Sequence, residues 1–235
     1  MKTDSSLNRW KSICAIALTV LLFSSSRAQT DSSSFIIAGQ AGYTSFSLPQ
    51  TRGILNDITT SIRYYHINAQ PLLIFPANLS GGCWIYIKAG ERFWLRGGIE
   101  DAKTRGVVGY SDVNGKLVED VRVNLFFIKG GAVVDIFREL SYTAYVSLDI
   151  EDLIATRDYE EKITFTQFSY LNSRDTYSDD GNCLVVQPGV GVRYSFLGFV
   201  ASAECGYHFN DTPQNSTFVD DFYGWSFSAS LGIPL

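Results

Sequence analysis

The stretch YGWSFSASLGIPL, residues 223–235, decides the fold. Every second residue in it is apolar or aromatic, and the residues between are serine, glycine or proline. Alternation with a period of two is the pattern of a β-strand with one apolar face. A strand that crosses a bilayer within a barrel needs about 10 such residues. We therefore expect a membrane-spanning strand whose lipid-facing residues are Tyr223, Trp225, Phe227, Ala229, Leu231, Ile233 and Leu235.

The same alternation recurs along the chain and predicts about eight strands. The other predicted strands cover residues 35–47, 82–90, 92–102, 121–127, 142–150, 184–196 and 199–209. Between residues 121 and 127 the polar face holds Arg122, and the pattern then changes near Gly130 and Gly131, where a β-bulge would account for it. The apolar face of that strand is expected to consist of Val121, Val123, Leu125 and Phe127.

Short and long connections alternate between these strands. The short ones are residues 89–91, 135–139 and 197–198, and the long ones are residues 48–81, 105–115, 155–182 and 210–221. An antiparallel up-and-down transmembrane β-barrel has this layout, with short periplasmic turns and long extracellular loops. We expect the first long connection to be a loop with one or two helical turns, because Ile54, Ile58 and Ile62 recur at helical spacing.

Residues 1–28 have the composition of a cleaved signal peptide. Lys2, Arg9 and Lys11 form a basic start, an apolar stretch follows, and Ser26 and Ala28 supply the small residues of a cleavage site. We expect cleavage after Ala28, a short segment at residues 29–34, and a barrel over residues 35–235. The predicted location is therefore the outer membrane of a bacterium, reached by export.

Composition narrows the remaining function classes. The net charge of −5 argues against a nucleic-acid-binding surface, which is normally basic. The whole chain has two histidines, so no metal site or cofactor site is predicted. Cys83, Cys183 and Cys205 follow the predicted cleavage site, and the sequence leaves their disulfide state open.

The face opposite the apolar one carries charges of both signs. An eight-stranded barrel is just wide enough for its own side chains to fill it, so these charges are expected to pair inside the lumen. This predicts a lumen plugged by ion pairs, and a narrow porin-like channel for small solutes is the alternative. The inward-facing candidates are Lys88, Arg96, Glu100, Arg122, Asp149, Glu151, Arg193, Glu204 and His208.

Residues 35–235 resemble the outer-membrane β-barrel domain family, with the architecture of the small OmpA- and OmpX-like bacterial barrels. The resemblance rests on the signal peptide, the strands rich in glycine and aromatic residues, and the closing strand at residues 223–235. It implies a monomer in contact with outer-membrane lipid and lipopolysaccharide, inserted by the barrel-assembly machinery, with a structural or surface-interaction role. One departure is Leu235, which stands where this family usually ends in an aromatic residue.

Three further interpretations rest on single features. The family includes lipid A deacylases, and His208 with Glu204 faintly resembles their catalytic site. Asn210 stands where the deacylases place the serine nucleophile, so no enzyme is expected. Aromatic residues at strand ends predict girdles at the two membrane interfaces, formed by Trp84, Trp94, Tyr207 and Trp225. Acidic clusters such as Asp158 with Glu160 and Glu161 could bind divalent cations.

Overall fold

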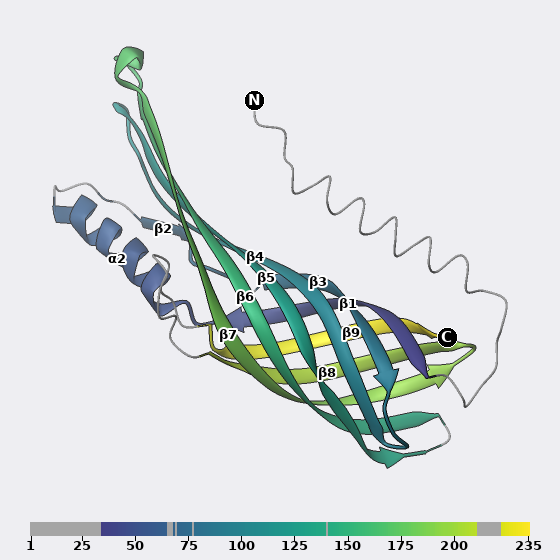
Figure 1. Cartoon of the computed structure of the whole chain (residues 1–235). Coiled ribbons are helices and arrows are strands. Elements are labelled where there is room, and N and C mark those ends of the chain that lie inside the picture. Colours follow the sequence, from purple (N-terminus) through teal and green to yellow (C-terminus); the bar gives the residue numbers. More distant parts are fainter. Residues whose placement is uncertain (1–33, 65–67, 69, 77, 140, 211–221) are drawn as a thin grey trace.

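The computed structural model describes residues 34–64, 68, 70–76, 78–139, 141–210 and 222–235. The predicted signal peptide, residues 1–28, and most of the segment 29–34 lie outside this range. The described part forms one antiparallel sheet that closes into a ring of eight strands (Figure 1). Its strands are β1 (Phe35–Phe46), β3 (Asn78–Lys88), β4 (Phe93–Ser111), β5 (Gly115–Arg138), β6 (Tyr142–Phe165), β7 (Ser173–Phe196), β8 (Phe199–Asn210) and β9 (Gly224–Pro234).

The ring is an up-and-down barrel. Each strand pairs antiparallel with the next one of the ring along the chain, and β1 pairs with β9 to close it. The predicted fold class is therefore confirmed. A further short strand, β2 (Gln70–Leu73), pairs with the outer part of β4, and a 3-10 helix, η1 (Ser169–Leu171), joins β6 to β7. None of the helices in the described ranges is long and apolar enough to cross a membrane.

The strands of the central hairpins are far longer than predicted. The strands β5, β6 and β7 each have 24 residues and β4 has 19, whereas a bilayer crossing needs about 10. The predicted loops at residues 105–115 and 155–182 are therefore mostly strand. Ion pairs on the outer face support these extensions, with Arg122 linking Asp120 to Glu160 at 2.7 and 3.6 Å. Figure 1 shows them rising as tall hairpins beyond the other strands.

The short turns lie at the opposite end of the barrel. Between β7 and β8 the turn consists of Leu197 and Gly198, both with positive φ (46° and 79°), as in the tight hairpins that match the twist of paired strands. The other two short turns connect β3 to β4 and β5 to β6. The chain starts β1 and ends β9 at this same end, so one end of the barrel is compact and the other is built up (Figure 1).

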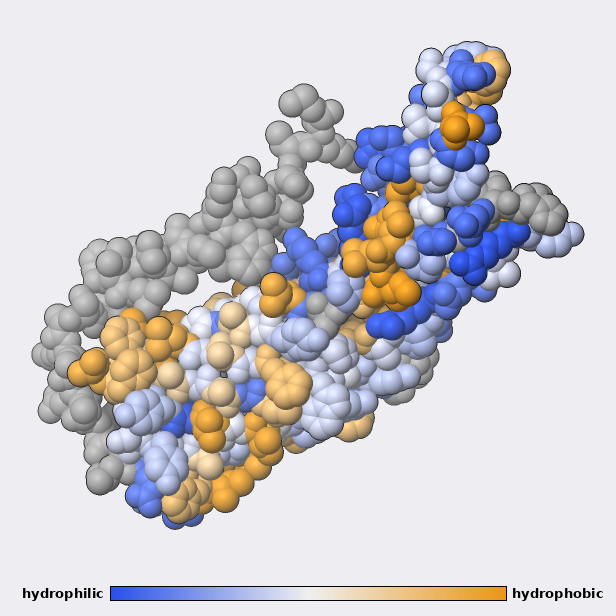
Figure 2. All heavy atoms as spheres, turned by 180° about the vertical axis from the view of Figure 1, so that it is seen from behind, coloured by the Kyte–Doolittle hydropathy of each residue, from blue (hydrophilic) through white to orange (hydrophobic). Residues whose placement is uncertain are grey.

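Outward-facing apolar residues surround the compact half of the barrel. Trp225 and Phe227 of β9 are about half exposed, and the outward residues of β6 and β7 between 146 and 154 and between 184 and 196 are mostly apolar. Further along the tall hairpins the outward residues are polar or charged, for example Arg105, Arg122 and Asp158. Figure 2 shows this change from hydrophobic side chains on the barrel wall to mainly hydrophilic ones on the hairpins.

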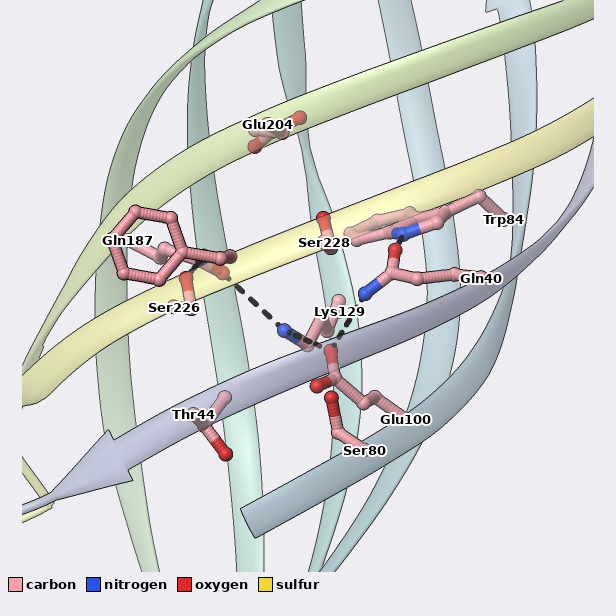
Figure 3. A pocket seen from close by; sticks show the side chains of 11 residues that line it. Gln40, Thr44, Ser80, Trp84, Glu100, Lys129, Gln187, Glu204, Ser226 and Ser228 are labelled. Atoms are coloured by element: carbon pink, nitrogen blue, oxygen red, sulfur yellow. Dashed lines mark hydrogen bonds and ion pairs between the residues drawn. The ribbon is translucent and has the colours of Figure 1, made fainter. Parts of the chain in front are cut away.

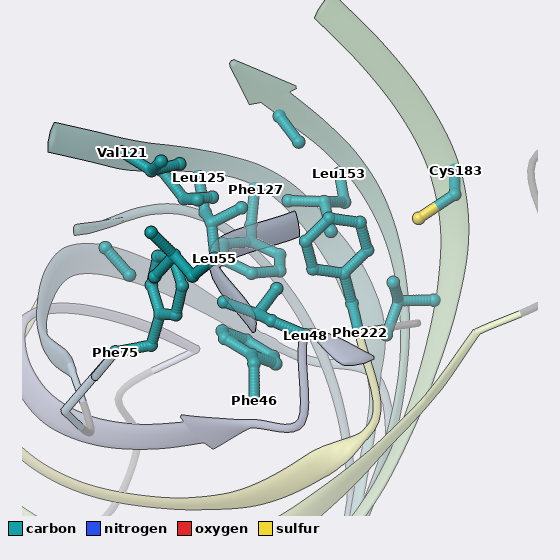
Figure 4. Packing of buried hydrophobic residues seen from close by; sticks show 14 of the residues in the cluster. Phe46, Leu48, Leu55, Phe75, Val121, Leu125, Phe127, Leu153, Cys183 and Phe222 are labelled. Carbon is teal, nitrogen blue, oxygen red and sulfur yellow. The ribbon is translucent and has the colours of Figure 1, made fainter. Parts of the chain in front are cut away.

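The polarity of the inner face changes along the barrel in the opposite direction to that of the outer face. At the built-up end it is apolar, because α2 (Pro49–Tyr64) places Leu55 against Phe75, Leu125 and Phe127 (Figure 4). The helix has 16 residues, four turns or more rather than the one or two expected. It is ordered by burial of one face, which carries Thr51, Leu55 and Thr59. We call this cluster the apolar plug; its buried members include Phe46, Leu48, Leu55, Phe75, Val121, Val123, Leu125, Phe127, Leu153, Val185 and Phe222.

The apolar plug overturns the face assigned to residues 121–127. Val121, Val123, Leu125 and Phe127 are at most 1% exposed and point inward, so Arg122 points outward. No bulge occurs at Gly130 and Gly131, since β5 keeps one register with β6 from Gly115 to Asp135. The alternation was real, but the apolar side of the strand is the inner side at this level.

Candidate functional site

Between the apolar plug and the compact end of the barrel, charged side chains from several strands cross the lumen. The guanidinium of Arg96, on β4, donates through Nε to Asp149 Oδ1 at 2.8 Å and through Nη1 to Glu204 Oε2 at 2.6 Å. Asp149 comes from β6 and Glu204 from β8, so one arginine joins strands on different sides of the barrel. The indole of Trp84 lies against this guanidinium, with Cζ 4.5 Å from the ring centroid.

A second group lies between Arg96 and the apolar plug and is centred on Lys129. Its Nζ is 2.8 Å from Glu100 Oε2 and 2.9 Å from Glu151 Oε1, and all three side chains are at most 4% exposed. Gln187 accepts a hydrogen bond from Nζ at 3.3 Å. Figure 3 shows Lys129, Glu100 and Gln187 converging with Gln40, which accepts a hydrogen bond from Trp84 Nε1 and donates one to Glu100 at 3.1 Å.

Arg193 occupies the compact end of the lumen. Its guanidinium lies 5.1 to 5.4 Å from the ring centroids of Tyr86, Trp94 and Tyr145, and 3.7 Å from Asp135. Burying an unpaired charge costs roughly several kcal/mol, so buried charges are expected to form ion pairs. The three groups form what we call the lumen network: Trp84, Trp94, Arg96, Glu100, Lys129, Asp135, Tyr145, Asp149, Glu151, Gln187, Arg193 and Glu204.

Space inside the network is almost fully occupied. The cavity bounded by Gln40, Trp84, Lys129 and Glu204 has a volume of about 10 Å³, which is close to the minimum needed for one water molecule. Solutes would also have to pass the apolar plug, where Phe127, Leu125 and Leu153 are fully buried. An ion-paired layer and an apolar layer of side chains therefore follow one another along the barrel axis.

The structure places eight of the nine predicted inward residues in or beside the lumen network. Lys88 is half-buried at the compact end, with Nζ 5.9 Å from the ring of Trp94, and Arg122 lies outside the barrel. Each predicted lipid-facing residue of the closing strand lies on the outer face, partly or fully exposed. Of the predicted inward residues, the structure brings the following into ion pairs inside the barrel: Arg96, Glu100, Asp149, Glu151, Arg193, Glu204 and His208.

Sequence reasoning missed Lys129, the cation between two carboxylates. Its signal was present, because residues 121, 123, 125, 127 and 129 all lie on one face of the strand, and the register with β6 is continuous through them. The girdle assignment was also wrong for Trp84 and Trp94, which are about 5% exposed and stack on arginines inside. Tyr207 and Trp225 form an edge-to-face pair, their ring centroids 5.1 Å apart, and Trp225 is exposed on the outer face.

His208 lies at the boundary between the network and the apolar plug. Its Nε2 is 3.4 Å from Glu151 Oε2, and the rings of Phe46 and Phe127 cover it at centroid distances of 5.2 and 5.9 Å. The imidazole is 0% exposed, so substrate outside the barrel cannot reach it. Asn210, at the position where a deacylase-like site needs a serine, accepts a hydrogen bond from the Phe222 amide.

The acidic clusters form internal contacts. Arg174 lies 2.8 Å from Glu160, and Arg157 lies 2.9 Å from Asp179. Within the described ranges no group of three or more His, Cys, Asp or Glu side chains is arranged to hold a metal ion. A further acidic pair in the sequence, Asp220 and Asp221, lies outside those ranges. Cys83, Cys183 and Cys205 form no disulfide with one another.

Comparison with known proteins gives similarity of architecture. No protein-family model and no curated protein sequence matches the chain. Matching solved structures include Neisserial surface protein A (12% identity, covering 86% of this chain and 98% of that one, TM-score 0.47). Ail of Yersinia pestis, solved with the heparin analogue sucrose octasulfate, matches at 14% identity (86% and 97% covered, TM-score 0.40). The N-terminal β-barrel domain of Pseudomonas aeruginosa OprF matches at 12% identity (85% and 97% covered, TM-score 0.36).

These matches are outer-membrane barrels, the class that the sequence resembles. At 12% to 14% identity the similarity concerns the fold alone and says nothing of ligand or activity. Evidence on function comes from the geometry of the lumen and of the tall hairpins.

Proposed function

We propose that this chain is a sealed outer-membrane barrel that anchors a tall β-structure at the cell surface. The observation that carries the proposal is the filled lumen, closed by the lumen network and again by the apolar plug. A barrel closed twice does not serve transport, while its longest strands extend beyond the length that a membrane requires. Its role is then structural or one of surface interaction.

The outer surface supports membrane insertion. Closed barrels satisfy every backbone group of their strands, which the hydrocarbon interior of a membrane requires. Exposed apolar residues such as Leu148, Ile150 and Val190 surround the compact half, where lipid and lipopolysaccharide would cover them. Insertion as a monomer by the barrel-assembly machinery is part of this proposal, and so is export through a cleaved signal peptide.

The porin-like alternative needs an open path, and the cavity of about 10 Å³ offers none. The enzyme alternative needs a reachable nucleophile and base, and His208 is enclosed by two phenylalanine rings and Glu151. No specific observation favours either alternative over a sealed barrel.

Planar-bilayer recording tests the sealing. Purified protein is reconstituted, its insertion is verified by protease protection, and a porin in the same preparation serves as the positive control. We expect no steady unitary current from this chain. Reproducible unitary steps that scale with salt concentration would contradict the sealed lumen and support the channel.

A further inference from the structure

A groove of about 450 Å³ lies outside the membrane-spanning part, between α2 and the tall hairpin of β5 and β6. The helix contributes Ile54, Ile58 and Ile62, which recur every four residues next to its buried face, and Ile62 also packs against the apolar plug. The hairpin contributes Leu117 and Ile163. Apolar walls and a volume of several hundred Å³ are typical of a pocket for a small organic molecule.

Two carboxylates stand opposite each other on the hairpin wall of this groove. Glu119 and Glu161 are direct cross-strand partners, and both are half-buried. Like charges in that position destabilise a sheet. A hydrogen bond joins the two side chains, and burial, followed by the charge of Glu161, raises the pKa of Glu119 to about 7. The pair therefore holds a proton that a bound cation could replace.

Among the described residues, no lysine, arginine or histidine nitrogen lies within ion-pair distance of Glu119 or Glu161. Arg122 and Arg174 bind Glu160, which lies on the opposite face of the hairpin. The helix adds a third acidic group to the groove, Asp57, which is exposed. The groove thus joins apolar walls to uncompensated negative charge.

We propose that this groove binds a small organic cation, an ammonium group carried on an apolar body. The ammonium group would bind between Glu119 and Glu161, and the body would lie against the isoleucines of α2. Charge complementarity selects the ammonium group, and the aliphatic walls select against small hydrated ions. This inference deepens the proposed surface-interaction role and rests on it.

Calorimetric titration of the full-length barrel in lipid nanodiscs tests the proposal. The probes are tryptamine and its neutral isostere tryptophol, which differ in carrying an ammonium or a hydroxyl group. We expect saturable binding of tryptamine at pH 8, about tenfold tighter than that of tryptophol. Binding should weaken by about tenfold at pH 5.5, because the proton on Glu119 then competes with the ammonium group.

Matched variants locate the site. The double variant Glu119→Gln with Glu161→Gln preserves shape and should remove the preference for tryptamine, while Glu91→Gln, in a short turn at the far end, should leave it unchanged. Equal binding of the two probes, or a preference that survives the double variant, would overturn the proposal. So would saturable Ca²⁺ binding that needs both glutamates in a protein that does not bind tryptamine. Bilayer recording tests the sealed lumen, and this titration tests the groove. A failure of the proposed function can therefore be told apart from a failure of the cation site.

Discussion

At the scale of single residues, Lys129 has the strongest predicted effect on stability. Replacing it by methionine keeps the length and leaves Glu100 and Glu151 buried without their cation. Removing one partner of a buried ion pair costs about 3–5 kcal/mol. We expect Lys129→Met to lower the temperature at which the folded band disappears in SDS electrophoresis.

Lys88 supplies the control for that experiment. It lies half-buried at the compact end, near the ring of Trp94, and outside the Glu100–Glu151 pair. Lys88→Met should have a small effect, and the pair Lys129→Met with Glu100→Gln should recover part of the loss. Equal sensitivity at Lys88 and Lys129 would contradict the assignment of Lys129 to a buried ion pair.

The raised pKa of Glu119 should make the stability of the β5–β6 hairpin depend on pH. The Glu119 pKa of about 7 in the folded protein exceeds the ordinary glutamate value, so the native state binds more protons between roughly pH 4.5 and 7. Stability of the hairpin should therefore decrease as the pH rises through this window. Hydrogen exchange of residues 115–123 and 157–165, corrected for intrinsic rates, should show weaker protection at pH 8 than at pH 5. Glu119→Gln should remove this difference, and an unchanged pH response in that variant would refute the assignment.

At the scale of elements, α2 depends on the apolar plug for its order. Leu55 is 4% exposed among Phe75, Leu125 and Phe127, whereas Ile54 faces the groove. Leu55→Ala should cost about 2–5 kcal/mol locally and increase hydrogen exchange over residues 49–64. Ile54→Ala should have a much smaller effect. Because the lumen network is separate, neither variant should conduct in a bilayer, and current from Leu55→Ala would show that the plug is the sole seal.

Alternation predicted the strands because lipid demands an apolar outer face on each of them. The period does not state which face is outer, and at residues 121–127 the barrel interior is the apolar side. That ambiguity misplaced Arg122 and concealed Lys129. The tall hairpins could not be predicted because their outer faces are held by ion pairs such as Arg122 with Glu160, which lack an apolar signal.

The lumen charges were predictable as a set, but their pairing was not. Parity places Arg96, Asp149 and Glu204 inward, while the contacts among them depend on how three strands face one another across the ring. Trp84 and Trp94 were misplaced for a related reason. A tryptophan near a strand end suits a membrane interface, and here each instead covers an arginine inside the barrel.

At the scale of the whole molecule, two gradients run along the barrel in opposite directions. The outer face is apolar at the compact half and charged on the tall hairpins, while the inner face is charged at the compact half and apolar at the plug. A soluble barrel would bury its apolar residues inside throughout its length. The compact half, with apolar residues outside and charged residues inside, is where lipid is expected. The built-up end, with apolar residues inside, is the part that folds in water.

The most direct test of the central claim, a closed barrel inserted in the outer membrane, is heat modifiability. Outer-membrane and periplasmic fractions are prepared, and each is run in SDS with and without boiling. We predict that the protein is found in the outer membrane and migrates faster unheated, because a closed barrel resists SDS. A protein found in the soluble periplasm with identical mobility in both samples would contradict the account.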